Sequence, residues 1–145
     1  MSIVTKVFAR ANAFLLQITH GRLGSRMGQQ SVLLLHTVGR KSGKSYTTPL
    51  SYYRDGKNYL IVASNWGQED PPDWFRNLVR HSRTTIQVKD TTLQVEARQA
   101  EGEEYQRLWQ VVTRQNSQYL EYQKTLTRRI PIVILSPVSQ PLGSG

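Results

Sequence analysis

The sequence predicts an α+β domain, a small and mainly antiparallel β-barrel with peripheral helices. Three observations favour this class. About six short segments rich in β-forming residues occur along the chain, and most of them are joined by hairpin signals. Helical segments fall between the hairpins, so strands and helices do not alternate as they do in parallel βαβ folds. A chain of 145 residues without an internal repeat has room for one sizeable core and not for two domains.

The N-terminal segment is predicted to form an amphipathic helix. Apolar residues recur three to four apart from Ile3 to Ile18, while Lys6 and Arg10 lie elsewhere around the turn. A basic, glycine-rich stretch follows, so we assign residues 1–30 to this helix and a linker. The helix is compatible with three roles, because it could cover an edge of the core, lie on a membrane or close over a ligand pocket.

The β-rich runs define the strands of the barrel. Asp55-Gly56 and Lys89-Asp90 mark two hairpins, and Gly39–Lys44 marks a turn. The first run is continuously apolar, which is typical of a buried strand. The predicted strands are Ser31–Thr37, Ser45–Tyr53, Tyr59–Ala63, Thr84–Val88, Thr92–Ala97 and Ile132–Leu135.

Three helices are predicted between these runs. Trp74 and Leu78 share a face over Asp73–His81, where two prolines precede the first turn. A second helix begins near Glu101, and a third covers Ser117–Thr127. The barrel domain is therefore assigned to residues 31–137, and residues 138–145 to a flexible tail.

Composition limits the chemistry that the protein can perform alone. The chain has no cysteine and three scattered histidines, so no metal site is predicted and redox chemistry would need a cofactor. Residues 1–54 contain eight basic and no acidic residues, which favours a polyanionic partner: nucleic acid, anionic lipid, or a phosphorylated or polycarboxylate small molecule. No stretch approaches the roughly 18 apolar residues of a membrane span. We expect a mature, cytoplasmic protein.

The turn Gly39–Lys44 is the sharpest local feature. Its two glycines allow unusual backbone dihedrals that expose amide N–H groups, and Arg40, Lys41 and Lys44 add positive charge. Such a loop is suited to holding a phosphate, although it does not match a Walker A loop. An ordinary solvated turn is the alternative.

Two further clusters could contact a flat ring. Small and polar residues over Ala63–Gly67 follow a strand, where a ring could approach the backbone. The alternative is a tight turn with Trp66 packed on the core. Asn77 lies one turn from Trp74 on the predicted helix and could orient the loop that precedes the helix or face a ligand. Tyr119 and Tyr122 share a helical face and could pack in the core or form an aromatic wall that donates a proton.

Taken together, these motifs resemble the deazaflavin-dependent nitroreductase and quinone reductase family, whose members use coenzyme F-420. The resemblance runs from about Val32 to Pro137 and is specific as a combination of ordered motifs. The matching segments are Leu33–Gly43, Thr48–Leu50, Asp55-Gly56, Val62–Asn65, Pro72–Leu78 and Ile130–Val133.

The resemblance implies a split β-barrel like those that bind FMN, and hydride transfer from reduced coenzyme F-420 to an electron-poor acceptor, most plausibly a quinone. It implies that a phosphate group binds at Arg40, Lys41, Ser42, Gly43 and Lys44. The implied ring site and its support are Thr48, Pro49, Leu50, Val62, Ala63, Ser64, Asn65, Trp74 and Asn77. Substrate positioning or proton donation falls to Tyr119, Tyr122 and Ser51.

Three residues depart from the pattern of the nitroreductase. Ser51 and Asn116 replace tyrosines, and Tyr46 replaces an arginine, which argues against nitroimidazole reduction. The expected partners are a quinone-like acceptor, without nucleic acid, and a peripheral membrane contact through the N-terminal helix. The alternatives are a nucleic-acid-binding barrel that uses the basic half of the chain, and a split barrel that binds FMN or haem.

Overall fold

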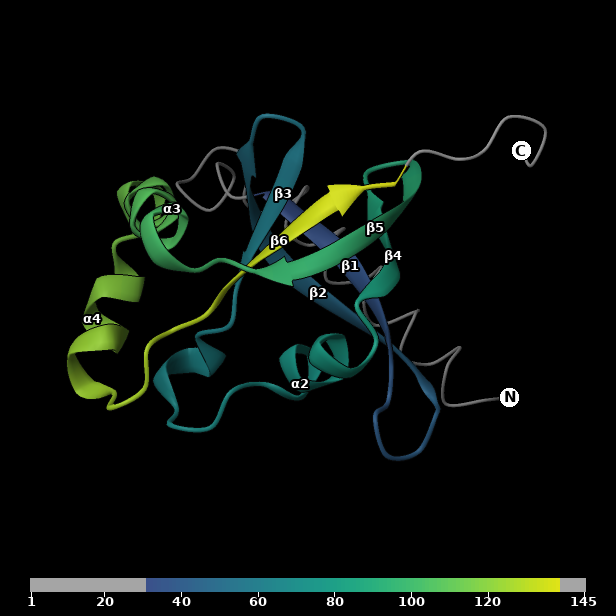
Figure 1. The fold of residues 1–145 in the computed structure, drawn as a ribbon, viewed down its shortest axis with the longest axis horizontal. Coiled ribbons are helices and arrows are strands. Elements are labelled where there is room, and N and C mark those ends of the chain that lie inside the picture. Colours follow the sequence, from purple (N-terminus) through teal and green to yellow (C-terminus); the bar gives the residue numbers. More distant parts are fainter. Residues whose placement is uncertain (1–30, 139–145) are drawn as a thin grey trace, which may run out of the picture.

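The computed structural model describes residues 31–138. They form a closed barrel of six strands in the order β1-β2-β3-β6-β5-β4, with three α-helices at its periphery (Figure 1). The strands are β1 Ser31–Val38, β2 Ser45–Asp55, β3 Asn58–Val62, β4 Arg83–Val88, β5 Thr91–Gln99 and β6 Ile132–Pro137. The helices are α2 Asp73–Arg80, α3 Gly102–Gln115 and α4 Gln118–Thr125, with a short 3-10 turn η2 at Asn65–Gly67.

All six strand pairings are antiparallel, so the predicted barrel class is confirmed. The hairpin turns lie where the sequence indicates, with Gly56 at φ 61° and Lys89 at φ 55°. The last strand is longer than predicted, because Ser136 and Pro137 still face β5. Val138, assigned to the tail, also donates its N–H to the carbonyl of Gln94 at 2.9 Å. The predicted N-terminal helix and the rest of the tail lie outside the described residues.

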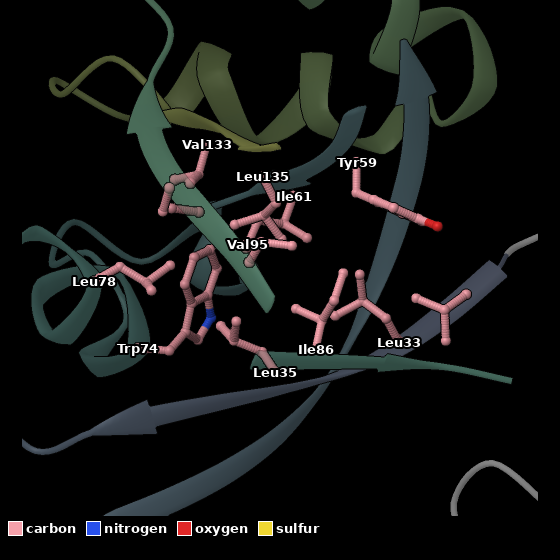
Figure 2. Close-up of a cluster of buried hydrophobic side chains, with 13 residues drawn as sticks. Leu33, Leu35, Tyr59, Ile61, Trp74, Leu78, Ile86, Val95, Val133 and Leu135 are labelled. Carbon is pink, nitrogen blue, oxygen red and sulfur yellow. The ribbon is translucent and has the colours of Figure 1, made fainter. Parts of the chain in front are cut away.

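The interior of the barrel holds one hydrophobic cluster, drawn in Figure 2. Alternate residues of each strand point inward, as the period of two in a strand requires. Trp74 and Leu78 reach this cluster from α2, and Figure 2 shows the Trp74 indole beside Leu35. Helix α2 therefore closes one end of the barrel.

A second cluster lies outside the barrel, between its wall and helices α3 and α4. Ile132 and Ile134 of β6 face these helices, whereas Val133 and Leu135 face the barrel interior. The first four residues of β6 are thus buried on both faces of the strand, which explains the apolar run Ile132–Leu135. None of the helices in the described part of the chain has both the length and the apolar character that crossing a membrane requires.

Candidate functional site

A cavity of about 410 Å³ lies between helix α2 and the turn that joins β1 to β2. Six of the residues predicted to bind the cofactor line it together, although they come from three separate segments of the chain. They are Arg40, Lys41, Ser42, Thr48, Trp74 and Asn77. Thr37, Gly39, Tyr46 and Asp73 complete the lining.

Arg40 fixes the turn on helix α2. The side-chain oxygen of Asn77, which is only 4% exposed, accepts hydrogen bonds from the Arg40 backbone N–H at 3.2 Å and from Arg40 Nη1 at 3.0 Å. Arg40 Nη2 also lies 3.4 Å from the carboxylate of Asp73. Asn77 therefore orients the turn that carries Arg40, and not the loop between β3 and α2 that the sequence analysis named, because one buried amide positions both the backbone and the side chain of Arg40.

Two lysines of the turn beside the cavity have no carboxylate partner among the described residues. Lys41 and Lys44 are exposed, and neither forms an ion pair with another residue in the range 31–138. Most other ion pairs lie elsewhere, for example Arg107 with Asp55 at 2.9 Å. The turn is therefore a local source of positive potential beside a cavity, which suits an anionic ligand.

Thr37 adds a polar group that the sequence analysis missed. It is 4% exposed and lines the cavity, yet its hydroxyl has no hydrogen-bond partner among the described residues. Leaving a buried hydroxyl unpaired costs about 1–3 kcal/mol, so a bound ligand that pairs with it would recover this free energy. Thr37 lies within an apolar strand, where no sequence motif marks it.

The residues predicted to form the ring site at the end of β3 lie in different places in the structure. Val62 points outward into the cluster under α3 and α4, while Ala63 packs in the barrel interior with Trp74. This opposite placement follows from the alternation of side chains along a strand. Leu50 also packs against the interior cluster, and Pro49 pairs with Leu34 of β1. Ser64 and Asn65 are half-buried in the loop beyond β3.

Arg128 holds this loop in place and was not predicted from sequence. Its guanidinium donates to the carbonyl of Ala63 at 3.1 Å, of Ser64 at 2.9 Å, and of Gln68 twice, at 2.8 and 3.1 Å. Burial lowers the pKa of Arg128, but a guanidinium stays protonated in proteins. One side chain therefore satisfies three carbonyls of a loop 60 residues or more away in sequence.

The same loop rests on helix α4 through Gly67. This residue has φ +82°, and a Cβ atom added to it would lie 2.8 Å from Cδ1 of the Tyr122 ring. We therefore expect Gly67→Ala to lower the free energy of unfolding by about 2 kcal/mol, because backbone strain and a ring clash both act there. Gly56→Ala is the matched control, since Gly56 has φ +61° but open space around it, and about 1 kcal/mol is expected.

Urea denaturation of both variants measures this difference. Equal losses at the two positions would show that Tyr122 moves aside freely and that the contact between the loop and α4 is loose.

Of the three residues predicted to position substrate or donate a proton, Tyr119 and Tyr122 both belong to the outer cluster beside α4, and Ser51 lies on β2. Tyr119 is 8% exposed in the outer cluster, with its hydroxyl 3.0 Å from that of Tyr53, and burial raises the pKa of Tyr119. Tyr119 therefore packs and hydrogen-bonds in the outer cluster, and its role toward a substrate stays a prediction. Tyr122 contacts the loop at Gly67, and Ser51 lies on β2 opposite Val32.

Known proteins resemble this chain in sequence and in fold. Residues 8–137 match the family model described as F420H(2)-dependent quinone reductase. A curated F420H(2)-dependent quinone reductase of Mycobacterium tuberculosis is 42% identical over 122 residues, covering 81% of this chain and 82% of the relative. A relative from Mycobacterium bovis has the same identity and coverage.

Solved structures of other proteins share the fold of this chain. An F420-H2 dependent reductase has a TM-score of 0.68 and 33% sequence identity, covering 73% of this chain and 94% of that structure. The haem storage protein HutZ of Vibrio cholerae, at 14% identity and a TM-score of 0.56, shares the fold alone. With its family model matched over most of its length and its relatives matched at this identity, the chain belongs to the F420H(2)-dependent quinone reductase family.

Proposed function

We propose that the protein transfers a hydride from reduced coenzyme F-420 to a quinone. The observation that carries the proposal is the cavity between the Arg40 turn and helix α2, which is lined by Lys41 without an ion pair among the described residues and has an unpaired hydroxyl in its wall. The relatives described above are named for the same cofactor and the same class of acceptor. Family membership and site geometry therefore point to one activity.

The residues present fit the anionic part of this cofactor, which carries a phosphodiester and an oligoglutamate tail. Lys41 and Lys44 would pair with its negative charges, and the hydroxyls of Ser42 and Thr37 would bond its oxygens. Arg40 would add a charged contact from a position that Asn77 already fixes. Preorganised donors of this kind bind an anion without first paying an ordering cost.

When bound, reduced coenzyme F-420 supplies the hydride. The chain orients the reacting groups and keeps water away from them. Trp74 forms the apolar floor between the cavity and the barrel interior, and Arg128 fixes the carbonyl groups of the loop that carries Ser64 and Asn65. Proton donation at Tyr122 or Ser51 stays a prediction.

The proposal also includes where the protein acts and which acceptors it does not reduce. We propose that the protein acts in the cytoplasm and contacts the membrane peripherally, because quinones with long isoprenoid tails reside in lipid. The predicted contact is the N-terminal segment, with Lys6 and Arg10 beside its apolar stripe. Reduction of nitro compounds is not expected, given Ser51, Asn116 and Tyr46.

Binding and turnover test the proposal separately. We expect purified protein to raise the fluorescence polarisation of oxidised coenzyme F-420, and the affinity to fall as ionic strength rises from about 0.01 M to about 0.1 M, where the Debye length shrinks from about 30 Å to about 10 Å. Adding a soluble naphthoquinone should then oxidise the reduced cofactor. FMN and DNA serve as competitors, and displacement of the deazaflavin by neither is expected. Unchanged polarisation at low salt would contradict the proposal.

A further inference from the structure

Trp66 is the most exposed large hydrophobic side chain in the described part of the chain. Its side chain is 80% exposed, compared with 8% for Trp74, which packs in the barrel interior. An indole has a large apolar surface, so leaving it in water forgoes about 25 cal/mol for every Å² that it could bury. A tryptophan in this environment gains free energy as soon as a flat ligand covers it.

The backbone of Trp66 adds a second cost. Trp66 has φ 58° and Asn65 has φ 49°, so two consecutive residues with side chains occupy the left-handed region. Each such residue costs of order 1–3 kcal/mol, and bulky side chains rarely adopt this conformation. The strain is held in place by Arg128 at both ends of the loop, by the Asn65 Nδ2 hydrogen bond to the Asp70 carbonyl at 2.8 Å, and by the Gly67 contact with α4.

The loop that carries Trp66 begins after Ala63, which packs in the same cluster as Trp74, a residue that lines the cavity. In Figure 1, the η2 segment that follows β3, helix α2 and the turn between β1 and β2 all lie along the same side of the barrel. Trp66 directly follows Ser64 and Asn65, the residues expected at the cofactor ring. A fixed, exposed, electron-rich ring on the same side of the barrel as the proposed cofactor site is suited to stacking on a flat, electron-poor ring that arrives from solvent.

We propose that Trp66 forms one face of the acceptor site and stacks on the quinone ring. The inference rests on the proposed function and assigns a residue that neither the sequence motifs nor the other contacts of the site identify. Trp66 contributes binding and orientation, and takes no part in the chemistry. Stacking restricts the tilt of the acceptor, and hydride transfer needs the two reacting atoms roughly 3 to 3.5 Å apart.

Trp66→Gly and Trp66→Phe test the proposal. Glycine removes the ring and also relieves the left-handed backbone, so this variant should fold with an unchanged or higher Tm. We expect its KM for a water-soluble naphthoquinone to rise about ten-fold, which corresponds to about 1.4 kcal/mol. The KM of Trp66→Phe should stay within about three-fold of the value for the unsubstituted protein, because the smaller ring still stacks. The Kd for coenzyme F-420 should change less than about two-fold in both variants.

Tryptophan fluorescence provides a readout that does not depend on turnover. The chain contains three tryptophans, of which Trp74 is buried and Trp109 stacks on Tyr105. The same naphthoquinone should quench the emission of the full-length protein saturably, and Trp66→Phe should remove most of that quenching, leaving the smaller part that comes from Trp74 in the cavity lining. If the protein bound no coenzyme F-420, the proposed function would fail while this quenching still reported on Trp66.

Three results would overturn the inference. An unchanged KM in Trp66→Gly would show that the indole does not contact the acceptor. A weakened Kd for coenzyme F-420 with unchanged KM would place Trp66 at the cofactor instead. Loss of binding to vesicles of anionic phospholipid, with unchanged KM for the soluble quinone, would make Trp66 a membrane-surface residue.

Discussion

Replacing Arg40 and Lys41 together by glutamine should raise the Kd for coenzyme F-420 by about 100-fold. Each charge-assisted hydrogen bond contributes roughly 1.5–3 kcal/mol, and a ten-fold change in affinity corresponds to about 1.4 kcal/mol. Both side chains line the cavity, and the positive charge of Lys41 has no carboxylate partner among residues 31–138. Fluorescence polarisation at low salt measures the change.

Two further variants make this result interpretable. Lys57→Gln with Lys89→Gln removes the same charge from the turns β2–β3 and β4–β5, which lie at the other end of the barrel from α2 (Figure 1). That variant should change Kd less than about two-fold when both variants are compared again at about 0.1 M salt, where the Debye length is about 10 Å and charges at the other end of the barrel are largely screened. Lys41→Gln with Lys44→Gln leaves the Arg40 bonds to Asn77 intact and should still weaken binding. An unaltered Kd in both cavity variants would remove the basis of the proposed function.

Replacing Arg128 by methionine should lower the free energy of unfolding by about 3 kcal/mol and the Tm by about 10 °C. Methionine fills much of the space of the arginine stem but donates no hydrogen bond. The carbonyls of Ala63, Ser64 and Gln68 would lose their shared donor, and the first two of these contacts are partly buried. Arg128→Lys should recover less than half of the loss, because one ammonium group cannot reproduce the planar fork of donors.

Arg129→Met is the matched control for the neighbouring position. The Arg129 guanidinium lies 3.4 Å from the ring centroid of Tyr105, and an exposed cation–π contact is worth about 0.5–1 kcal/mol. Thermal unfolding compares the two variants, and limited proteolysis reports whether residues 64–70 become accessible. If Arg128→Met and Arg129→Met lowered the free energy of unfolding by amounts that agree within about 1 kcal/mol, the loop would keep its conformation without Arg128.

Local patterns in the sequence were sufficient to predict the elements of this fold. The hairpins at Asp55-Gly56 and Lys89-Asp90 were predictable because a tight turn needs particular residues at its own positions. The helix over α2 was predictable because Trp74 and Leu78 repeat at helical spacing and both reach the core. In each case the information lies within a few neighbouring residues.

The contacts that build the site join residues far apart in the chain, and local patterns do not reveal them. Arg40 and Asn77 are 37 positions apart, and nothing near either residue predicts that one amide oxygen accepts both hydrogen bonds. The burial of Tyr119 depends on which side of α4 faces the barrel, and apolar and polar residues are mixed around that helix. Thr37, Arg128 and the left-handed Trp66 become visible only in three dimensions.

Strand β6 is the last element of the barrel in the chain, yet it lies between β3 and β5. A ribosome adds residues at about 5–20 per second, so the first five strands are all synthesised while the gap between β3 and β5 is still open. Two strand edges stay unpaired during that interval, and unpaired edges are the part of a sheet that recruits other chains. The nascent protein is therefore most vulnerable to mispairing just before β6 emerges. Synthesis of β6 closes the barrel and removes both exposed edges.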